Sequence, residues 1–65
     1  MYANSIMKYR RLLKLRQSDL AEDLGVTRQT INAIENGKYL PNMELAFRLA
    51  KAFNCNIEDI FYINK

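Results

Sequence analysis

Four polar side chains in one short segment have the types and the spacing to read DNA bases. They are Thr27, Arg28, Gln29 and Asn32. On a helix that begins near Thr27, they would point away from the apolar face that carries Ile31. Arginine can donate two hydrogen bonds to guanine, and glutamine or asparagine can pair with adenine through both amide atoms. The segment therefore predicts base contacts in the major groove. Without the residues that flank them, the same four side chains would more simply be explained as the solvated face of a helix.

Two short amphipathic helices joined by a tight turn must position these side chains. The first helix is expected over about residues 17–24, with its leucines on the buried face. Gly25 follows where a terminating residue with positive φ is needed, and Thr27 is a suitable N-cap for the second helix, which ends near Asn36. Two helices linked by a short glycine-containing turn predict a helix-turn-helix, whose second helix can lie in the DNA major groove.

The ordered residues of this motif point to a known family. They are Gln17, Leu20, Ala21, Gly25, Val26, Thr27, Gln29, Thr30, Ile31, Ile34, Glu35, Asn36, Gly37, Lys38 and Pro41. In this order they resemble the lambda/434 repressor and Cro family, also called Xre, and the resemblance extends over roughly residues 6–61. It implies an all-α, five-helix, lambda-repressor-like domain. It also implies that Arg28, Gln29 and Asn32 occupy the base-reading positions.

Four further positions are candidates for contact with DNA phosphates. Gln17 opens the first helix of the motif, where unpaired backbone amides and the positive end of the helix dipole favour an anion. The resemblance implies that Asn36, Lys38 and Asn42, in or beside the loop after the recognition helix, contact the opposite backbone wall. Asn36 also suits a turn and Asn42 suits a helix cap, and one residue can do both.

Arg10 and Glu35 are expected to form a partly buried ion pair beneath the DNA-facing surface. The resemblance implies this pair, because relatives with arginine and glutamate at these positions form it. The role should be structural, since removing one partner would leave an unpaired charge in a partly buried place.

The connection before the motif departs from the family pattern at two positions. A helix is expected from near Asn4 or Ser5, both suitable caps, to about Leu13, with its apolar residues at helical spacing. Lys14 stands where the family favours glycine, so it must adopt a positive φ or extend the helix. Arg16 stands where the family favours Ser, Thr or Asn, so the next helix loses an N-cap worth about 1 kcal/mol. Asp19 in the first turn partly offsets this loss through the helix dipole.

Two more helices are expected after the motif. One should extend over residues 43–53 with Asn42 as its cap, and a short one should follow over about residues 57–61. The core-facing stripe of the longer helix is expected to contain Met43, Ala46, Leu49, Ala50 and Phe53. The two ends of the chain, near Tyr2 and near Tyr62, are β-prone and could pair as a small sheet.

The charge of the chain is uneven and fits a polyanionic partner. The 65 residues carry a net charge of +3. All of this excess lies in residues 1–32, which contain six basic against three acidic side chains. Lysine and arginine bind nucleic acid by releasing counterions from the phosphates. A solvated charged surface would explain the same charge equally well.

The residue inventory argues against an enzyme and against a metal or cofactor site. The chain has no histidine and one cysteine, Cys55, so it offers no Ser-His or Cys-His pair and no zinc site. No glycine-rich phosphate loop is present. A single cysteine excludes an internal disulfide and suits a cytoplasmic protein. No apolar run fits a membrane span or a signal peptide, so residues 1–65 are expected to form one domain away from the membrane.

A homodimer is expected, because one short recognition helix reads too few base pairs to discriminate among sites. Two copies related by a dyad would read half-sites about 34 Å apart on a near-palindrome. The interface is expected at the C-terminal end, with Phe61, Tyr62 and Ile63 as contacts together with Phe47.

The sequence therefore predicts a duplex-DNA-binding transcriptional regulator, expected to be a repressor. One alternative is an antitoxin-like or adaptor module that uses the same fold to hold a partner protein. Exposed base-reading side chains argue against that as the sole role. A second alternative, a binder of RNA or single strands, is disfavoured because the aromatic residues fall at core or dimer-contact positions rather than on a basic surface.

Overall fold

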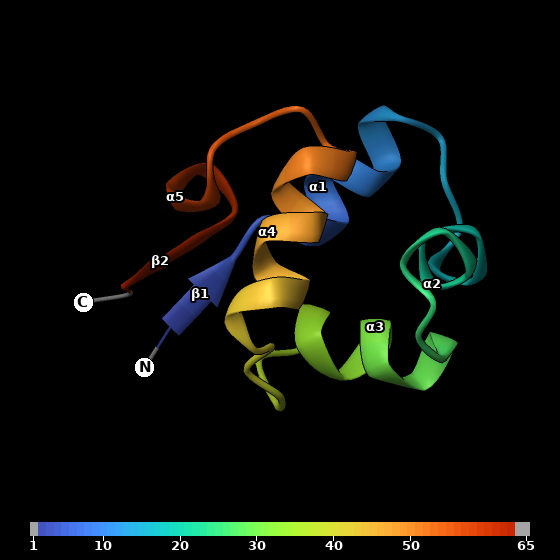
Figure 1. Cartoon of the computed structure of the whole chain (residues 1–65), viewed down its shortest axis with the longest axis horizontal. Coiled ribbons are helices and arrows are strands. Elements are labelled where there is room, and N and C mark those ends of the chain that lie inside the picture. Colours follow the sequence, from blue (N-terminus) through green and yellow to red (C-terminus); the bar gives the residue numbers. More distant parts are fainter. Residues whose placement is uncertain (1, 64–65) are drawn as a thin grey trace.

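The computed structural model describes residues 2–63 and contains, within that range, five helices and two short strands (Figure 1). In chain order they are β1 (Tyr2–Asn4), α1 (Ile6–Leu12), α2 (Gln17–Leu24), α3 (Arg28–Glu35), α4 (Met43–Ala52), α5 (Ile57–Ile60) and β2 (Phe61–Ile63). The strands β1 and β2 pair antiparallel, with Ala3 opposite Tyr62. The expected five-helix fold is confirmed, and so is the pairing of the two ends of the chain. None of these helices is long and apolar enough to cross a membrane.

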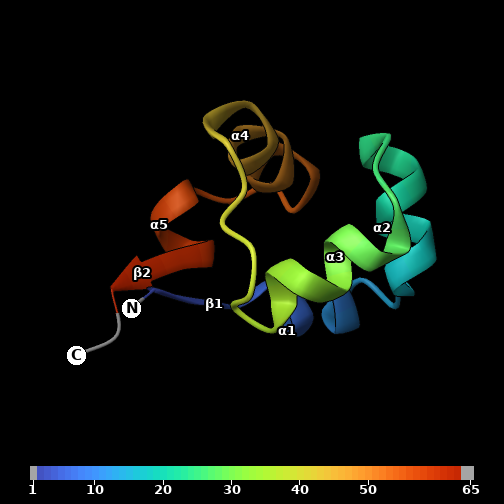
Figure 2. The same cartoon turned by 90° about the horizontal axis from the view of Figure 1, so that it is seen from below.

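The helix α2 and the terminal sheet lie at opposite ends of the molecule. The Cα atoms span 31 × 22 × 21 Å, and α2 lies at one end of the long axis while α5 and the two strands lie at the other (Figures 1 and 2). The helix α3 extends along the lower side in Figure 1, between these two ends. This arrangement leaves α3 on the outer side of the molecule, with its last turn bonded to Asn4 at the end of β1.

Every helix contributes at least one side chain to a single apolar core. Six of these side chains are at most 1% exposed: Ile6, Leu20, Ile31, Ile34, Leu49 and Ile60. The ring of Tyr9 stacks on Phe53 at the end of α4, with the ring centroids 5.6 Å apart. Since α3 contributes two of the six residues, its buried face is held along its length.

The turn between α2 and α3 forms as the sequence predicts. Gly25 has a φ of +71° and ends α2. The backbone N–H of Val26 then donates to the Ala21 carbonyl at 3.0 Å, and the Val26 side chain packs against the core. Thr27 caps α3, because its hydroxyl accepts the backbone N–H of Thr30 at 3.1 Å. The expected bounds of α2 and α3 are confirmed by these caps.

The two departures from the family pattern have different structural outcomes. Lys14 adopts a φ of +58°, so the connection after α1 uses a left-handed lysine where glycine would be unstrained. Arg16 cannot cap α2 with its side chain, but the Asp19 carboxylate accepts the Arg16 backbone N–H at 2.9 Å and its guanidinium Nε at 3.2 Å. The hydrogen bond from the Arg16 side chain, followed by that from its backbone, lowers the pKa of Asp19. Asp19 thus stabilises the start of α2 by direct bonds as well as by its charge.

The expected core stripe of α4 is wrong at Met43, which is 67% exposed. Its place is taken by Leu45, which is buried. At 100° per residue, Met43 lies about 90° from the centre of the stripe formed with Leu49 and Phe53, so it falls at the edge. Asn42 starts the helix by accepting the Leu45 N–H at 2.8 Å, which leaves Met43 in a first turn beyond the core.

Three helix ends also differ by one residue from expectation. Leu13 is the C-cap of α1 and is half exposed, so it does not join the core face of that helix. Phe53 is the C-cap of α4 rather than its last helical residue. Phe61 leaves α5 with extended geometry because it pairs with Asn4 in the sheet.

Replacing Gly25 with alanine should lower the free energy of unfolding by about 1–2 kcal/mol, because an L side chain is strained at positive φ. Strain alone should set this cost, since a Cβ at Gly25 would meet no atom within 4 Å. Gly37 has the same φ of +71° and the same empty surroundings, so Gly37→Ala should cost about as much. Urea unfolding followed by circular dichroism measures both. A variant as stable as the unmodified protein would contradict the argument.

Candidate nucleic-acid interface

The helix α3 has one buried face and one exposed polar face. Ile31 and Ile34 are fully buried, whereas Arg28 and Gln29 are exposed. Within residues 2–63, neither the Arg28 nor the Gln29 side chain has a hydrogen-bond or ion-pair partner. Both therefore present their full donor and acceptor capacity to an incoming ligand.

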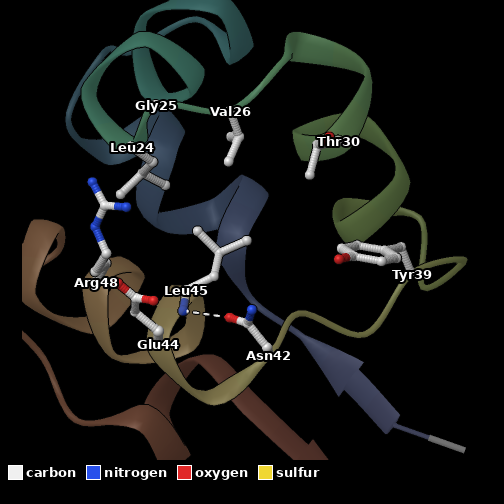
Figure 3. A pocket seen from close by; sticks show the side chains of 9 residues that line it. All are labelled: Leu24, Gly25, Val26, Thr30, Tyr39, Asn42, Glu44, Leu45 and Arg48. Carbon is white, nitrogen blue, oxygen red and sulfur yellow. Dashed lines mark hydrogen bonds between the residues drawn. The ribbon is translucent and has the colours of Figure 1, made fainter.

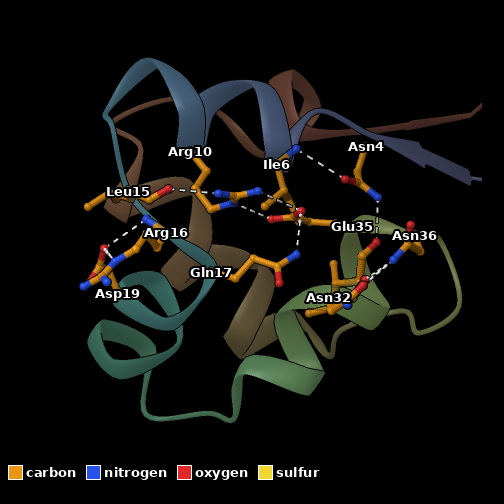
Figure 4. A network of polar contacts seen from close by, with 11 residues as sticks. Asn4, Ile6, Arg10, Leu15, Arg16, Gln17, Asp19, Asn32, Glu35 and Asn36 are labelled. Atoms are coloured by element: carbon orange, nitrogen blue, oxygen red, sulfur yellow. Dashed lines mark hydrogen bonds and ion pairs between the residues drawn. The ribbon is translucent and has the colours of Figure 1, made fainter.

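The other two predicted base readers are already bonded within the helix. The Thr27 hydroxyl caps α3 and also lies 2.9 Å from the Thr30 hydroxyl. The Asn36 side-chain nitrogen donates to the Asn32 carbonyl at 2.9 Å and also to the Asn32 side-chain oxygen (Figure 4). The four predicted base readers thus differ within the described residues: Arg28 and Gln29 have no bonded partner, whereas Thr27 and Asn32 are held by hydrogen bonds.

The four candidate phosphate contacts lie on both sides of α3. Lys38 and Asn42 are exposed on the connection between α3 and α4, and the bond that caps α4 uses only the side-chain oxygen of Asn42. Asn36 lies on the same side at the C-terminal end of α3, where its amide nitrogen is bonded to Asn32. Gln17 lies on the other side at the start of α2, and its amide nitrogen donates to Glu35 at 3.1 Å. Among residues 2–63, the Lys38 ammonium and the side-chain nitrogen of Asn42 have no hydrogen-bond partner.

A polar network beneath α3 is centred on the Glu35 carboxylate, which is fully buried. Arg10 donates to it through Nε at 2.7 Å and through Nη2 at 3.3 Å, and Gln17 supplies the third donor (Figure 4). The remaining nitrogen of Arg10, Nη1, donates to the Leu15 carbonyl at 2.9 Å. The structure therefore contains the ion pair that the sequence resemblance implies. It also adds Gln17, which sequence reasoning assigned to phosphate alone.

Asn4 is a structural residue that sequence reasoning treated only as a possible helix cap. Its side-chain nitrogen donates to the Ile34 carbonyl at 2.8 Å, and its side-chain oxygen accepts the Ile6 N–H at 3.3 Å. Asn4 thus ties the end of β1 to the last turn of α3. No local sequence signal could identify this bond, because its two ends are 30 residues apart.

A cavity of about 270 Å³ lies between the turn of the motif and the start of α4 (Figure 3). Val26 and Leu45 point into it from opposite sides, and Tyr39 lies at one end (Figure 3). Arg48 contributes to its polar rim. The lining comes from α2, the turn, α3, the following loop and α4, so the sequence pattern gave no sign of it.

The exposed side chains of this site offer hydrogen-bond donors and acceptors. Within residues 2–63, no three histidine, cysteine, aspartate or glutamate side chains cluster closely enough to hold a metal ion. A helix face with exposed arginine and amide groups suits recognition of polar edges, such as those of DNA bases.

Glu35→Ala should lower the free energy of unfolding by about 3 kcal/mol, because it leaves the mostly buried Arg10 guanidinium without its partner. Replacing both residues, as Arg10→Met with Glu35→Leu, should cost less than the two single changes together. Arg16→Ala is the matched control, since it breaks the exposed pair with Asp19 and should change stability far less. Urea unfolding of the five variants (Glu35→Ala, Arg16→Ala, the double change and its two single changes) measures these differences. Equal losses for Glu35→Ala and Arg16→Ala would contradict a structural role for the buried pair.

Comparison with known proteins identifies the family. The family model described as helix-turn-helix (HTH_3) matches residues 6–60. An HTH-type transcriptional regulator of Methanocaldococcus jannaschii is 59% identical over 58 residues, which is 89% of this chain and 88% of that protein. The regulator YgzD of Bacillus subtilis is 40% identical over 62 residues, which is 95% of this chain and 94% of that one.

A solved structure agrees with this result. The solution structure of the SOS-response transcriptional repressor LexA from Eubacterium rectale superposes with a TM-score of 0.79 at 31% identity. The match covers 85% of this chain but only 58% of the LexA chain, so the likeness is to part of that protein. Together with the geometry of α2 and α3, these matches show that the chain belongs to the helix-turn-helix family of lambda repressor-like (Xre) transcriptional regulators.

Proposed function

We propose that this protein is a cytoplasmic, homodimeric repressor that binds duplex DNA at a near-palindromic site. The observation that carries the proposal is the exposed face of α3, where Arg28 and Gln29 have no partner within residues 2–63. The buried isoleucines on the opposite face hold this surface outward. Family membership and the resemblance to a repressor support the same reading.

In the proposed complex, the first turns of α3 lie in the major groove. Arg28 donates to the two acceptors of guanine, and Gln29 pairs with adenine through its amide. Thr27 and Asn32 add contacts at either end of this pair. Because the Thr27 hydroxyl and the Asn32 amide are already bonded, they can contact bases from fewer directions than Arg28 and Gln29 can.

Phosphate contacts are proposed on both walls of the groove. Lys38 and the side-chain nitrogen of Asn42 can reach one strand from the loop after α3. The backbone N–H groups at the start of α2, next to Gln17, can bind the other strand. The Gln17 side chain itself serves Glu35, so we propose that Gln17 contributes through its backbone position.

The proposed dimer interface uses the end of the molecule that carries the terminal sheet. Ile63 is 75% exposed and Tyr62 is 47% exposed, and Phe47 on α4 is also exposed. Phe61 is half-buried and packs against its own core, so it would contribute less. A chain 31 Å long that joins its copy at one end brings two α3 helices to the scale of one DNA turn, about 34 Å.

Arg28→Ala and Gln29→Ala should each weaken binding to the selected duplex site by about 1–3 kcal/mol and change binding to random DNA little. The site is first selected from random duplex DNA with the unmodified protein, and affinities are measured by fluorescence anisotropy. Lys51→Ala is the control, because Lys51 is an exposed cation near the far end of α4. Equal losses on selected and random DNA would show that neither residue reads bases. Failure to select any sequence, with a protein partner recovered after nuclease treatment, would favour the adaptor alternative.

Sedimentation equilibrium at micromolar concentration should give twice the chain mass of 7.6 kDa. Ile63→Asp should shift the protein toward monomer, because a charge would be buried in the interface. Leu12→Asp is the matched control, since Leu12 is 68% exposed on α1, outside the proposed interface, and should leave the dimer intact. If the free protein is monomeric but two copies bind one palindrome, dimerisation is induced by the DNA. A monomer bound to one half-site would end the dimer proposal.

A further inference from the structure

We propose that Asn36 is a positioning residue that fixes the side-chain amide of Asn32 and so determines which base edge Asn32 reads. The inference rests on the proposed DNA-binding function and deepens it. It concerns specificity at one base pair, and it gives Asn36 a role other than phosphate contact.

Two hydrogen bonds from one nitrogen carry the proposal. The side-chain nitrogen of Asn36 donates to the Asn32 backbone carbonyl at 2.9 Å and to the Asn32 side-chain oxygen (Figure 4). Asn36 is also the C-cap of α3, with its backbone N–H on the same Asn32 carbonyl at 3.0 Å. The side chain that holds Asn32 is therefore itself anchored at the end of the helix.

An asparagine amide without such a clamp can turn over and present either its oxygen or its nitrogen. The oxygen only accepts hydrogen bonds, and the nitrogen only donates them. In this structure the Asn32 oxygen is directed at Asn36, and the Asn32 side-chain nitrogen has no partner within residues 2–63. Asn32 thus offers two N–H donors in a fixed orientation.

Fixed donors favour base edges that accept hydrogen bonds. Guanine presents two acceptors in the major groove, N7 and O6, whereas cytosine presents the N4 donor. We therefore expect Asn32 to select guanine over cytosine at its position. A freely turning asparagine would discriminate between these two bases less strongly.

The same geometry leaves Asn36 with no donor for a phosphate. An amide nitrogen carries two hydrogens, and the two acceptors on Asn32 occupy both. Its remaining oxygen is an acceptor and cannot bond a phosphate oxygen. Phosphate contact by the Asn36 side chain would require release of Asn32, so the two roles exclude each other.

Two variants of Asn36 test the proposal by their effect on base preference. Asn36→Ala removes the clamp and should reduce discrimination at the Asn32 base pair by about tenfold, the scale of one good base contact. Asn36→Asp places an acceptor where the donor stood, so Asn32 should turn over and present its oxygen. The preferred base should then change from guanine to one that presents a donor, cytosine or adenine.

The measurement is selection from random duplex DNA by each full-length variant, followed by affinities for all four base pairs at each position. Preferences at the positions read by Arg28 and Gln29 should not change. Asn32→Ala should abolish preference at the same base pair, and adding Asn36→Ala to it should have no further effect there. Asn56→Ala removes an exposed asparagine from the N-cap of α5 and is the matched control.

The outcomes separate this inference from the function on which it rests. A uniform loss of affinity in both Asn36 variants, with base preferences unchanged, would overturn the clamp and favour a phosphate or purely structural role. Thermal unfolding of each variant shows whether α3 is intact. Selection of no sequence by the unmodified protein would overturn the proposed function and this inference together.

Discussion

The position of α3 depends on the hydrogen bonds and the ion pair that the buried carboxylate of Glu35 forms. It accepts three N–H donors, two from Arg10 on α1 and one from Gln17 on α2, so one side chain fixes the end of α3 against both preceding helices. Burying an ion pair gives little net stability, because desolvation offsets much of the Coulomb attraction. The ion pair instead fixes the orientation of α3, since a shift that broke these bonds would leave the buried Glu35 charge without partners.

The exposed face of α3 contains side chains in two different states. Arg28 and Gln29 have long chains without partners in the described residues, so they can adapt to a base edge but lose side-chain freedom on binding. Thr27 and Asn32 have already lost that freedom through bonds to Thr30 and Asn36. A preorganised group pays less entropy on association and tolerates fewer partners. The surface thus combines adaptable contacts with restricted ones.

Features with a local signal could be predicted from the sequence, and features that depend on distant contacts could not. The bounds of α2 and α3 follow from the positive φ of Gly25 and from the side-chain cap of Thr27, which both act within one turn. The exposure of Met43 depends on where the core ends, and the inward turn of Gln17 depends on the buried Glu35. The bond between Asn32 and Asn36 was missed although it is local. Helical spacing predicts that the two residues are neighbours, but it does not predict that the Asn36 nitrogen faces the Asn32 oxygen.

The pairing of β1 with β2 has a consequence for the order in which the protein forms. Asn4 and Phe61 are partners in the sheet, and the Ser5 N–H donates to the Ile60 carbonyl at 2.8 Å. The first strand leaves the ribosome before α1, yet its partner is made after α5. The sheet therefore closes only after translation has passed β2. A surface that includes Tyr62 and Ile63 is therefore complete only once β2 has paired with β1.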